Sequence, residues 1–393
     1  MPRALNYLLV FVLVVVMACG GFIGGVLYER HRAAAVAGAD SGPAAVGDTV
    51  DEVREMLLHD ALEPSDDASM TAGAVRGLLS SLGDKYAEYF DARHYGYFKE
   101  DNAGEFGGIG VTLTQKDADT VVVSVMSGTP AEKAGIKKND VFYGIDGERR
   151  EGWDEQSVVK LVRGEPGTKV ALEMRRPGVK DPVKFTITRA VIKVPNVESK
   201  MIGSDVGYIS MAQFNERSAE DLGDALRALD GKGARGFVLD LRDDPGGSLD
   251  ESVDVASLFV ADGVITSVEY RDRPGRDYEA TGWHVTDKPL VVLVNGYSAS
   301  ASEIVAGALQ GYGRAELGGG KTVGKGGVQT VEPLGGGGAG EVTSAPYLTP
   351  EKRKSDGGGL TRDGGVAVKT ERVGADKGDI QLDRAVAELR KQL

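Results

Sequence analysis

The chain has 393 residues, of which 41% are apolar, so it is long enough for two or three domains with substantial hydrophobic cores. Its formal net charge of −13 at pH 7 argues against a nucleic-acid partner, because binding to phosphates requires a basic surface. The single cysteine, Cys19, excludes an intrachain disulfide, and the four histidines lie at no spacing that suits a metal site, so the sequence predicts neither a metal nor a cofactor.

The first feature along the chain is an uncharged apolar run, residues 8–28, which reads LLVFVLVVVMACGGFIGGVLY. As a helix rising about 1.5 Å per residue, it would cross the ~30 Å core of a bilayer. We therefore expect residues 1–28 to form an N-terminal transmembrane helix, with a cleaved signal peptide as the alternative. Residues 29–48 contain few large apolar side chains, which is typical of a flexible linker.

The next two regions differ in their hydrophobic periodicity. Residues 49–103 place apolar side chains at helical spacing and are expected to form a small helical domain. Residues 104–190 contain short alternating runs, such as 120–125 and 169–175, between Gly, Pro and Asp turns, with one helical stretch near 155–161. This second pattern predicts a small β-rich module.

In residues 191–355 strand-like and helix-like stretches alternate. The strands read as continuous apolar runs, which is typical of parallel strands covered on both faces. We expect strands over 206–211, 236–241 and 289–295, and helices near 218–229, 249–259 and 302–311. The alternation predicts an α/β core within a mixed α+β multidomain chain. The last segment, 356–393, is expected to end in an amphipathic helix.

Two loops of the predicted core carry the candidate chemistry, because ligands of parallel sheets gather beyond the carboxyl ends of the strands. The loop RDDPGGS contains Gly246 and Gly247, whose backbone N–H groups can form an anion nest. The loop GYSASAS places Ser298, Ser300 and Ser302 before a helix, whose N-terminus favours negative charge. Each loop alone is more often a turn or a helix cap, but together they indicate a nucleophilic serine.

A nucleophilic serine needs a base. His284 is the only histidine of the α/β region and has no evident carboxylate partner in the sequence, so a Ser-His-Asp triad is poorly supported. Lys321 and Lys325, in a glycine-dense loop, are the alternative. A lysine that acts as a base near neutral pH needs its pKa lowered from about 10.4 by two or three units, so we expect it to be packed inside the fold.

With these motifs in place, the chain resembles the carboxyl-terminal processing peptidases, also called tail-specific proteases, over nearly everything after the linker. The matching stretches are AVRGLLSSLGDKYAEYF, FGGIGV, GYISMAQFNERSAEDL, VLDLRDDPGGSLDESVDVASLF, SASASEIVAGALQGYGRA and GKGGVQT. The last three together are highly specific. This resemblance implies an α/β protease core of the ClpP/crotonase-like type over residues 191–355.

The resemblance also implies roles for individual residues. Ser300 corresponds to the nucleophile and Lys325 to its general base, which Gln329 orients. Backbone N–H groups of Gly246 and Ala301 would form the oxyanion hole. Ser298 would shape the turn, and Ser302 would cap the helix.

The β-rich module, 104–190, is similar to a PDZ domain. The resemblance implies that Gly107, Gly108, Ile109 and Gly110 bind the terminal carboxylate of a peptide that adds as a strand. Arg163 matches an arginine of the family that couples the PDZ domain to the active site.

Taken as a whole, the resemblance implies a serine endopeptidase that recognises protein or peptide substrates with apolar C-termini. It further implies a bacterial protein whose catalytic part lies outside the cytoplasm on a single N-terminal anchor, and it leaves room for a homo-oligomer or a regulatory partner.

The sequence departs from the family pattern at a few positions. Asp244 stands where the family often has Asn, and Gly320 and Val323 stand where it usually has Glu and Phe. Two other functions remain open: a non-catalytic PDZ scaffold or holdase tethered to the membrane, and a crotonase-like acyl-CoA enzyme. The second would need an adenine-nucleotide pocket, for which the sequence offers no feature.

Overall fold

The structure is a computed structural model that describes residues 45–63, 65–354, 357–360 and 378–393. The predicted transmembrane helix, within residues 1–28, and most of the predicted linker lie outside the described residues. Among the residues that are described, no helix is long and apolar enough to cross a membrane. The chain divides into two compact units, 1–77 and 78–393, which are taken separately below.

The region expected to be helical contains three helices and one strand. The helices are α2 (Val46–Asp60), α3 (Asp67–Ser80) and α4 (Ala92–Ala103). Asp91 caps α4 by accepting from the backbone N–H groups of Arg93 and His94. The strand β1 (Glu88–Phe90) was not anticipated, and it joins a sheet whose other strands come from the last third of the chain.

The β-rich module is a six-stranded antiparallel sheet with two short helices, in the order β3-β4-β5-β7-β8 and with β6 paired to β5. Its strands are β3 (Val111–Lys116), β4 (Asp119–Val125), β5 (Val141–Ile145), β6 (Glu148–Arg149), β7 (Lys169–Arg175) and β8 (Val183–Thr188), and its helices are α5 (Pro130–Ala134) and α6 (Glu155–Val162). The predicted strands 120–125 and 169–175 are therefore present as β4 and β7. A separate pair, β2 (Glu105–Gly108) with β9 (Ala190–Lys193), flanks the module in sequence.

The predicted α/β core contains a five-stranded sheet in the order β10-β11-β12-β15-β16. Its last four strands are parallel, while β10 pairs antiparallel with β11. The strands are β10 (Val197–Ile202), β11 (Val206–Met211), β12 (Gly236–Asp240), β15 (Leu290–Val294) and β16 (Glu316–Gly319). This confirms the three strands expected from continuous apolar runs.

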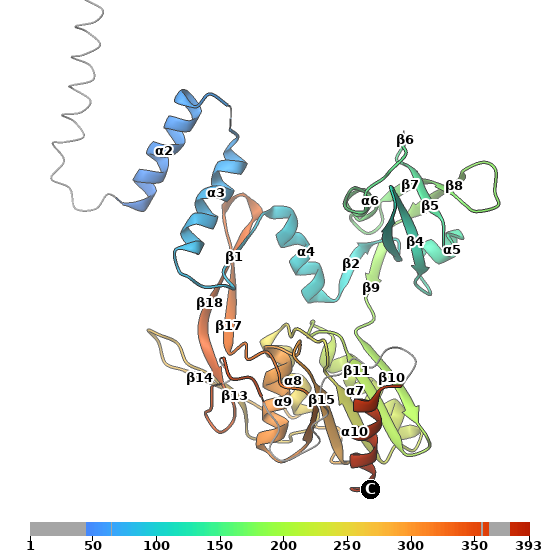
Figure 1. Cartoon of the computed structure of the whole chain (residues 1–393), viewed down its shortest axis with the longest axis vertical. Coiled ribbons are helices and arrows are strands. Elements are labelled where there is room, and N and C mark those ends of the chain that lie inside the picture. Colours follow the sequence, from blue (N-terminus) through green and yellow to red (C-terminus); the bar gives the residue numbers. More distant parts are fainter. Residues whose placement is uncertain (1–44, 64, 355–356, 361–377) are drawn as a thin grey trace, which may run out of the picture. The chain divides into compact units, whose positions relative to one another are not determined.

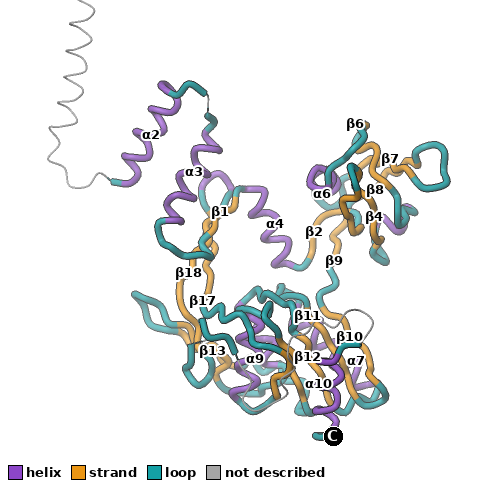
Figure 2. Tube along the Cα trace, in the orientation of Figure 1, coloured by secondary structure: helices purple, strands orange, loops and turns teal. Residues whose placement is uncertain are grey.

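Both faces of this sheet are covered by helices, which explains the unbroken apolar strands (Figure 1). Alternate residues such as Phe237 and Leu239 belong to the larger core cluster, which includes α7 (Ser218–Gly231), α8 (Leu249–Ser257) and α9 (Ala301–Gly311). Val238 points to the other face, where it joins residues of α10 (Ile380–Arg390). Figure 2 shows α10 next to β12, and the helix expected at the end of the chain is thus part of the core.

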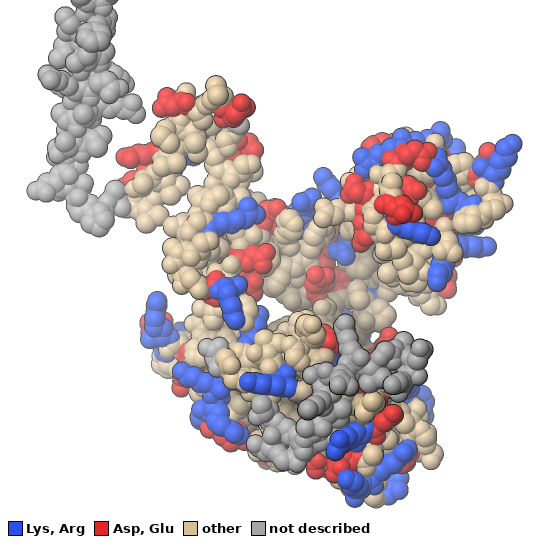
Figure 3. Space-filling view, in the orientation of Figure 1, with Lys and Arg blue, Asp and Glu red and all other residues tan. Residues whose placement is uncertain are grey.

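A second antiparallel sheet, which was not predicted, lies beside the α/β core in the same part of the chain. It runs β1-β18-β13-β14, and β17 also pairs with β18. Its strands besides β1 are β13 (Val264–Val268), β14 (Arg276–Glu279), β17 (Gly327–Pro333) and β18 (Ala339–Leu348), and a 3₁₀ turn, η1 (Gly335–Gly337), separates the last two. On the face shown in Figure 3, acidic and basic side chains intermingle over the described residues, so the negative net charge forms no single patch there.

Candidate active site

The two loops singled out in the sequence lie against each other. They follow the neighbouring parallel strands β12 and β15. A Cβ atom added to Gly246, which has a φ of +99°, would lie 2.7 Å from the carbonyl oxygen of Ala299 and 2.9 Å from Cβ of Ser300. Only glycine fits at this position, because any side chain would collide with the serine turn.

The three serines have different roles. The hydroxyl of Ser298 donates to the carbonyl of Leu241 at 2.7 Å and accepts from the N–H of Asn295, so this residue shapes the turn as expected. The expected cap at Ser302 is wrong, because the residue preceding helix α9 is Ser300. Ser302 lies within the first turn, and its hydroxyl donates to the carbonyl of Asp244 at 3.0 Å.

Ser300 has a strained backbone. Its φ of +52° and ψ of −113° lie in a region that residues other than glycine rarely adopt. Such a conformation costs about 1–3 kcal/mol and persists only where neighbouring contacts impose it. Here the N–H of the preceding Ala299 donates to the carbonyl of Asp244, and the N–H of Ser300 donates to Glu303 Oε2 at 3.0 Å.

Glu303 connects the serine turn to the lysine loop. Its side chain is fully buried, and Oε2 accepts from the backbone N–H of both Ser300 and Lys325, at 3.0 and 2.9 Å. The two nitrogens are thus within about 6 Å of each other. The other oxygen, Oε1, accepts from the hydroxyl of Thr322 and the N–H of Gly324. One carboxylate therefore joins the segments of the predicted nucleophile and the predicted base.

The side chain of Lys325 is half-buried rather than enclosed, and it lies among polar partners from distant segments. Its Nζ is 4.7 Å from the centre of the Tyr86 ring, which attracts a cation. Burial works to raise the pKa of Asp84, but the N–H groups of Thr343 and Tyr86, with the nearby Lys325, outweigh it and hold this pKa below its usual range. The amine of Lys325 therefore lies beside an aromatic ring and near the Asp84 carboxylate.

A second carboxyl group of the same region is Glu341. Its pKa is raised, first by partial burial and then by Glu88 and Asp84, while Lys325 acts in the opposite direction. Glu88 stands directly opposite Glu341 in the β1–β18 pairing, an arrangement of like charges that is unfavourable without a cation nearby. The charge of Lys325 lowers the pKa of both Asp84 and Glu341 and so opposes this repulsion.

Of the remaining predicted groups of the catalytic site, two are hydrogen-bonded to other residues and the third lies at a helix start. The side-chain amide of Gln329 on β17 donates to Thr343 Oγ1 at 3.1 Å. The N–H of Gly246 donates to Oδ1 of Asp244 at 2.8 Å. Ala301 is the first residue of α9, where helix N–H groups lack partners within the helix. The backbones of the predicted catalytic segments thus lie side by side, while several of their polar groups are hydrogen-bonded to other residues.

His284 does have a carboxylate neighbour, which corrects the expectation from the sequence. Its Nε2 lies 3.1 Å from Oδ1 of Asp287. The contacts that hold the Ser300 turn come from other residues, namely Leu241, Asp244, Asn295 and Glu303.

A groove of about 870 Å³ is lined by residues of the PDZ-like module, of α4 and of the segments 194–198 and 212–215. Gly108, Ile109 and Gly110 line one part of it, and β3 and α6 supply further residues. The β3 strand is at the edge of its sheet, so its outer edge can pair with an added strand. The apolar residues of the groove include Ile109, Val111, Leu113, Met126, Val159 and Val162.

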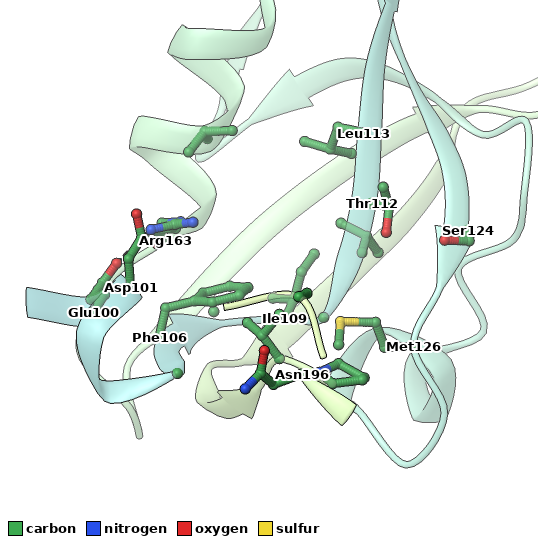
Figure 4. Close-up of a pocket in the computed structure, with 18 of the residues that line it drawn as sticks. Glu100, Asp101, Phe106, Ile109, Thr112, Leu113, Ser124, Met126, Arg163 and Asn196 are labelled. Carbon is green, nitrogen blue, oxygen red and sulfur yellow. Dashed lines mark hydrogen bonds and ion pairs between the residues drawn. The ribbon is translucent and has the colours of Figure 1, made fainter. Parts of the chain in front are cut away.

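Arg163 lies at the end of α6 and also lines this groove. Its guanidinium forms an ion pair with Glu100 of α4 and stacks 4.3 Å from the centre of the Phe106 ring. Figure 4 shows Arg163 beside Glu100 and Asp101. Gly164, which follows Arg163, donates its N–H to the carbonyl of Gly107. This hydrogen bond connects the predicted carboxylate loop to the end of α6.

Sequence reasoning missed the groups that connect these parts. For Glu303 a signal existed, because Ser300 and Glu303 have the Ser-x-x-Glu spacing of a capping box. For Asp84, Tyr86 and Glu341 no local signal existed, since they reach Lys325 only through the pairing of β1 with β18.

Comparison with known families defines the class of this protein. The model of peptidase family S41 matches residues 205–366, and the model of the PDZ domain matches residues 121–176. The fold is thus that of an S41 serine peptidase core preceded by a PDZ domain.

Curated relatives place the chain within that class. It is 40% identical over 306 residues to a carboxy-terminal-processing protease of Bartonella bacilliformis, which covers 76% of this chain and 70% of the relative. It is 37% identical to carboxy-terminal processing protease CtpA of Bacillus subtilis, over 77% of this chain and 65% of that protein. A solved photosystem II D1 C-terminal processing protease aligns at 30% identity over 80% of this chain and 85% of the other, with a TM-score of 0.47.

The chain belongs to the carboxy-terminal processing proteases of peptidase family S41. It spans about two thirds of the length of the curated relatives it matches.

Proposed function

We propose that the chain is a serine endopeptidase that cleaves proteins or peptides with apolar C-terminal tails. The observation that carries this proposal is the buried Glu303, because one of its oxygens binds the backbone N–H of both Ser300 and Lys325. A serine-lysine dyad requires the two side chains within hydrogen-bond reach, and backbones held this close allow such an approach.

In the proposed mechanism the Ser300 hydroxyl oxygen attacks the carbonyl carbon of the scissile bond, and Lys325 accepts the hydroxyl proton. The resulting oxyanion is stabilised by the N–H groups of Gly246 and Ala301. Collapse of this intermediate breaks the C–N bond, the leaving amine takes the proton from Lys325, and Ser300 is left as an ester. Lys325 then activates a water molecule that hydrolyses the ester.

Lys325 must reach its neutral form for this chemistry. In the structure its amine lies 4.7 Å from the centre of the Tyr86 ring and close enough to Asp84 and Glu341 to lower the pKa of both carboxyl groups, which supports a resting arrangement of the proposed enzyme. Gln329, now bonded to Thr343, would turn to Lys325 in the working arrangement.

The PDZ domain would supply the preference for apolar tails. A peptide that pairs with the free edge of β3 would place its terminal carboxylate at the loop of Gly107, Gly108, Ile109 and Gly110. Its last side chain would then lie among the apolar residues of the groove, and Arg163 would link peptide binding to α4.

For location, we propose a single N-terminal membrane anchor within residues 1–28 and a catalytic part outside the cytoplasm of a bacterium. The uncharged run 8–28 supports the anchor. A homo-oligomer or a regulatory partner belongs to the same proposal as a means of releasing the resting arrangement.

The test is proteolysis of a loosely folded substrate with an apolar tail by the full chain, with products read by mass spectrometry. Ser300→Ala and Lys325→Ala are expected to abolish cleavage, whereas the control Lys321→Ala, an exposed lysine of the same loop, should cleave as the wild type does. Tail binding without cleavage by the wild type, even with a PDZ-binding peptide added, would favour the scaffold or holdase instead.

A further inference from the structure

Asp244 is a buried acid whose environment is unusual. Its side chain is fully buried, and Oδ1 accepts the N–H of Gly246 at 2.8 Å. Within the described part of the chain, Oδ2 has no hydrogen-bond partner. An ionised carboxylate normally accepts several hydrogen bonds, and a buried charge without them is costly. This environment therefore favours the neutral carboxyl.

Among the charged groups named on its own loop and on α9, Arg242 alone could compensate a charge on Asp244, and it is engaged with other residues. On its own loop, Arg242 pairs with Asp240 and Asp379, and Asp243 bonds with Asn295. On α9, the carboxylate of Glu303 binds the Ser300 turn and the lysine loop, and Ser302 contributes only a hydroxyl. Burial accordingly raises the pKa of Asp244 to about 7, while the Gly246 N–H and the Ser302 hydroxyl act more weakly in the opposite direction.

Gly246 is the residue through which Asp244 can influence catalysis. A Cβ on Gly246 would lie 2.9 Å from both the Ala301 nitrogen and Ser300 Cβ, so this backbone borders the place where an oxyanion on a Ser300 adduct would form. Its N–H is held by Asp244 and must be released, or shared, to donate to that oxyanion. A charged carboxylate binds an N–H more strongly than a neutral one does and also repels a nearby oxyanion.

We propose that Asp244 is a positioning residue that acts through the Gly246 N–H: the neutral acid releases this N–H to the oxyanion, and the ionised acid retains it and suppresses catalysis. This inference rests on the proposed function, because it requires Ser300 to form a tetrahedral adduct. The neutral and ionised forms of Asp244 differ by one proton, which this residue exchanges with solvent.

The test is the pH dependence of kcat/KM for the full chain, between pH 5.5 and 9.5, with Asp244→Asn beside the wild type. The Asn variant keeps a neutral acceptor at every pH. Above about pH 7, the ratio of kcat/KM for the variant to that for the wild type is expected to rise, approaching about tenfold per pH unit, whatever the titration of Lys325. Asp243→Asn, on the same loop but bonded to Asn295, is the matched control and should keep the wild-type profile.

A ratio that stays constant with pH while the wild type shows Ser300-dependent cleavage would overturn this inference and leave the proposed function intact. Absence of Ser300-dependent cleavage at every pH would overturn both. If Asp244→Asn does not fold, Asp244→Ala gives the same decision, because it also lacks an ionisable group: its ratio to wild type must rise with pH, even if its overall rate is lower.

Discussion

The Ser300 turn and the Lys325 loop share one anchor but differ in what places their side chains. The serine turn is determined within a short stretch by the hydroxyl of Ser298, the strained φ of Ser300 and the carboxylate of Glu303. The backbone of Lys325 is held by the same carboxylate, yet its amine is placed by residues of β1, β18 and the segment before β1.

This difference would let the proposed site combine a nucleophile of fixed position with a base whose side chain can move. Backbone contacts to a buried carboxylate are short and directional, and they hold both segments. Charges of half-exposed side chains act over longer distances and are weakened by solvent. Substitution of Glu303 should therefore disrupt the site, whereas substitutions around the amine of Lys325 should change its activity by smaller amounts.

The largest effect is expected for Glu303→Ala, which removes the shared anchor. Four donors, in two buried and two partly buried hydrogen bonds, lose their acceptor, so we expect the free energy of unfolding to fall by about 4 kcal/mol or more and cleavage to be lost. Urea unfolding and the cleavage assay measure the two effects. Glu316→Ala, at an exposed glutamate, is the control. Equal stability of the two variants would show that Glu303 does not hold the two segments together.

The next effect concerns the stability of the fold against pH. Because the pKa of Asp244 is near 7 in the folded chain and about 3.9 when unfolded, the folded state holds an extra proton between these values. The contribution of this residue to stability is thus present below about pH 4 and declines by up to roughly 4 kcal/mol as the pH rises through 7. Asp244→Asn should remove this decline in urea unfolding measured from pH 4 to 8; parallel curves for the variant and the wild type would contradict it.

A smaller effect is expected for Glu341→Gln, which removes one negative charge near Lys325. The ammonium form of the lysine becomes less favourable, so the acid limb of the kcat/KM profile should move to lower pH. At neutral pH we expect a gain of roughly fivefold, as for a loss of about 1 kcal/mol of charge attraction. Glu332→Gln, an exposed neighbour on β17, should leave the limb in place. A shift toward higher pH for Glu341→Gln would refute the assigned counter-ion role.

The smallest effect is expected for Arg163→Ala, outside both segments. Loss of the pair with Glu100 and the stacking on Phe106 should lower the free energy of unfolding by about 1 kcal/mol. If Arg163 links the groove to α4, KM for tailed substrates should also change. Expressed as a free energy, this change should exceed the change in the free energy of unfolding. Arg163→Lys, which keeps the charge but not the planar stacking, separates the two contributions.

Several elements could be predicted from local patterns, and others could not. The parallel strands were evident because Phe237, Val238 and Leu239 form an unbroken apolar run, which only burial on both faces explains. The short strand β1 lacked such a signal, since Glu88 is exposed and the strand is only three residues long. The sheet formed by β17 and β18 lies in glycine-rich sequence, where hydrophobic alternation is weak.

The sequence by itself determined the order of the modules, the apolar strands and helices, and the serine and lysine segments that match the S41 family, because each depends on residues close together in the chain. Only the tertiary structure decided that Glu303 binds both segments, that Asp244 holds the Gly246 N–H, and that Asp84, Tyr86 and Glu341 surround the lysine amine. The physical reason is that hydrogen bonds and charge interactions depend on distances in space, which strand pairing between remote segments sets and no local periodicity encodes.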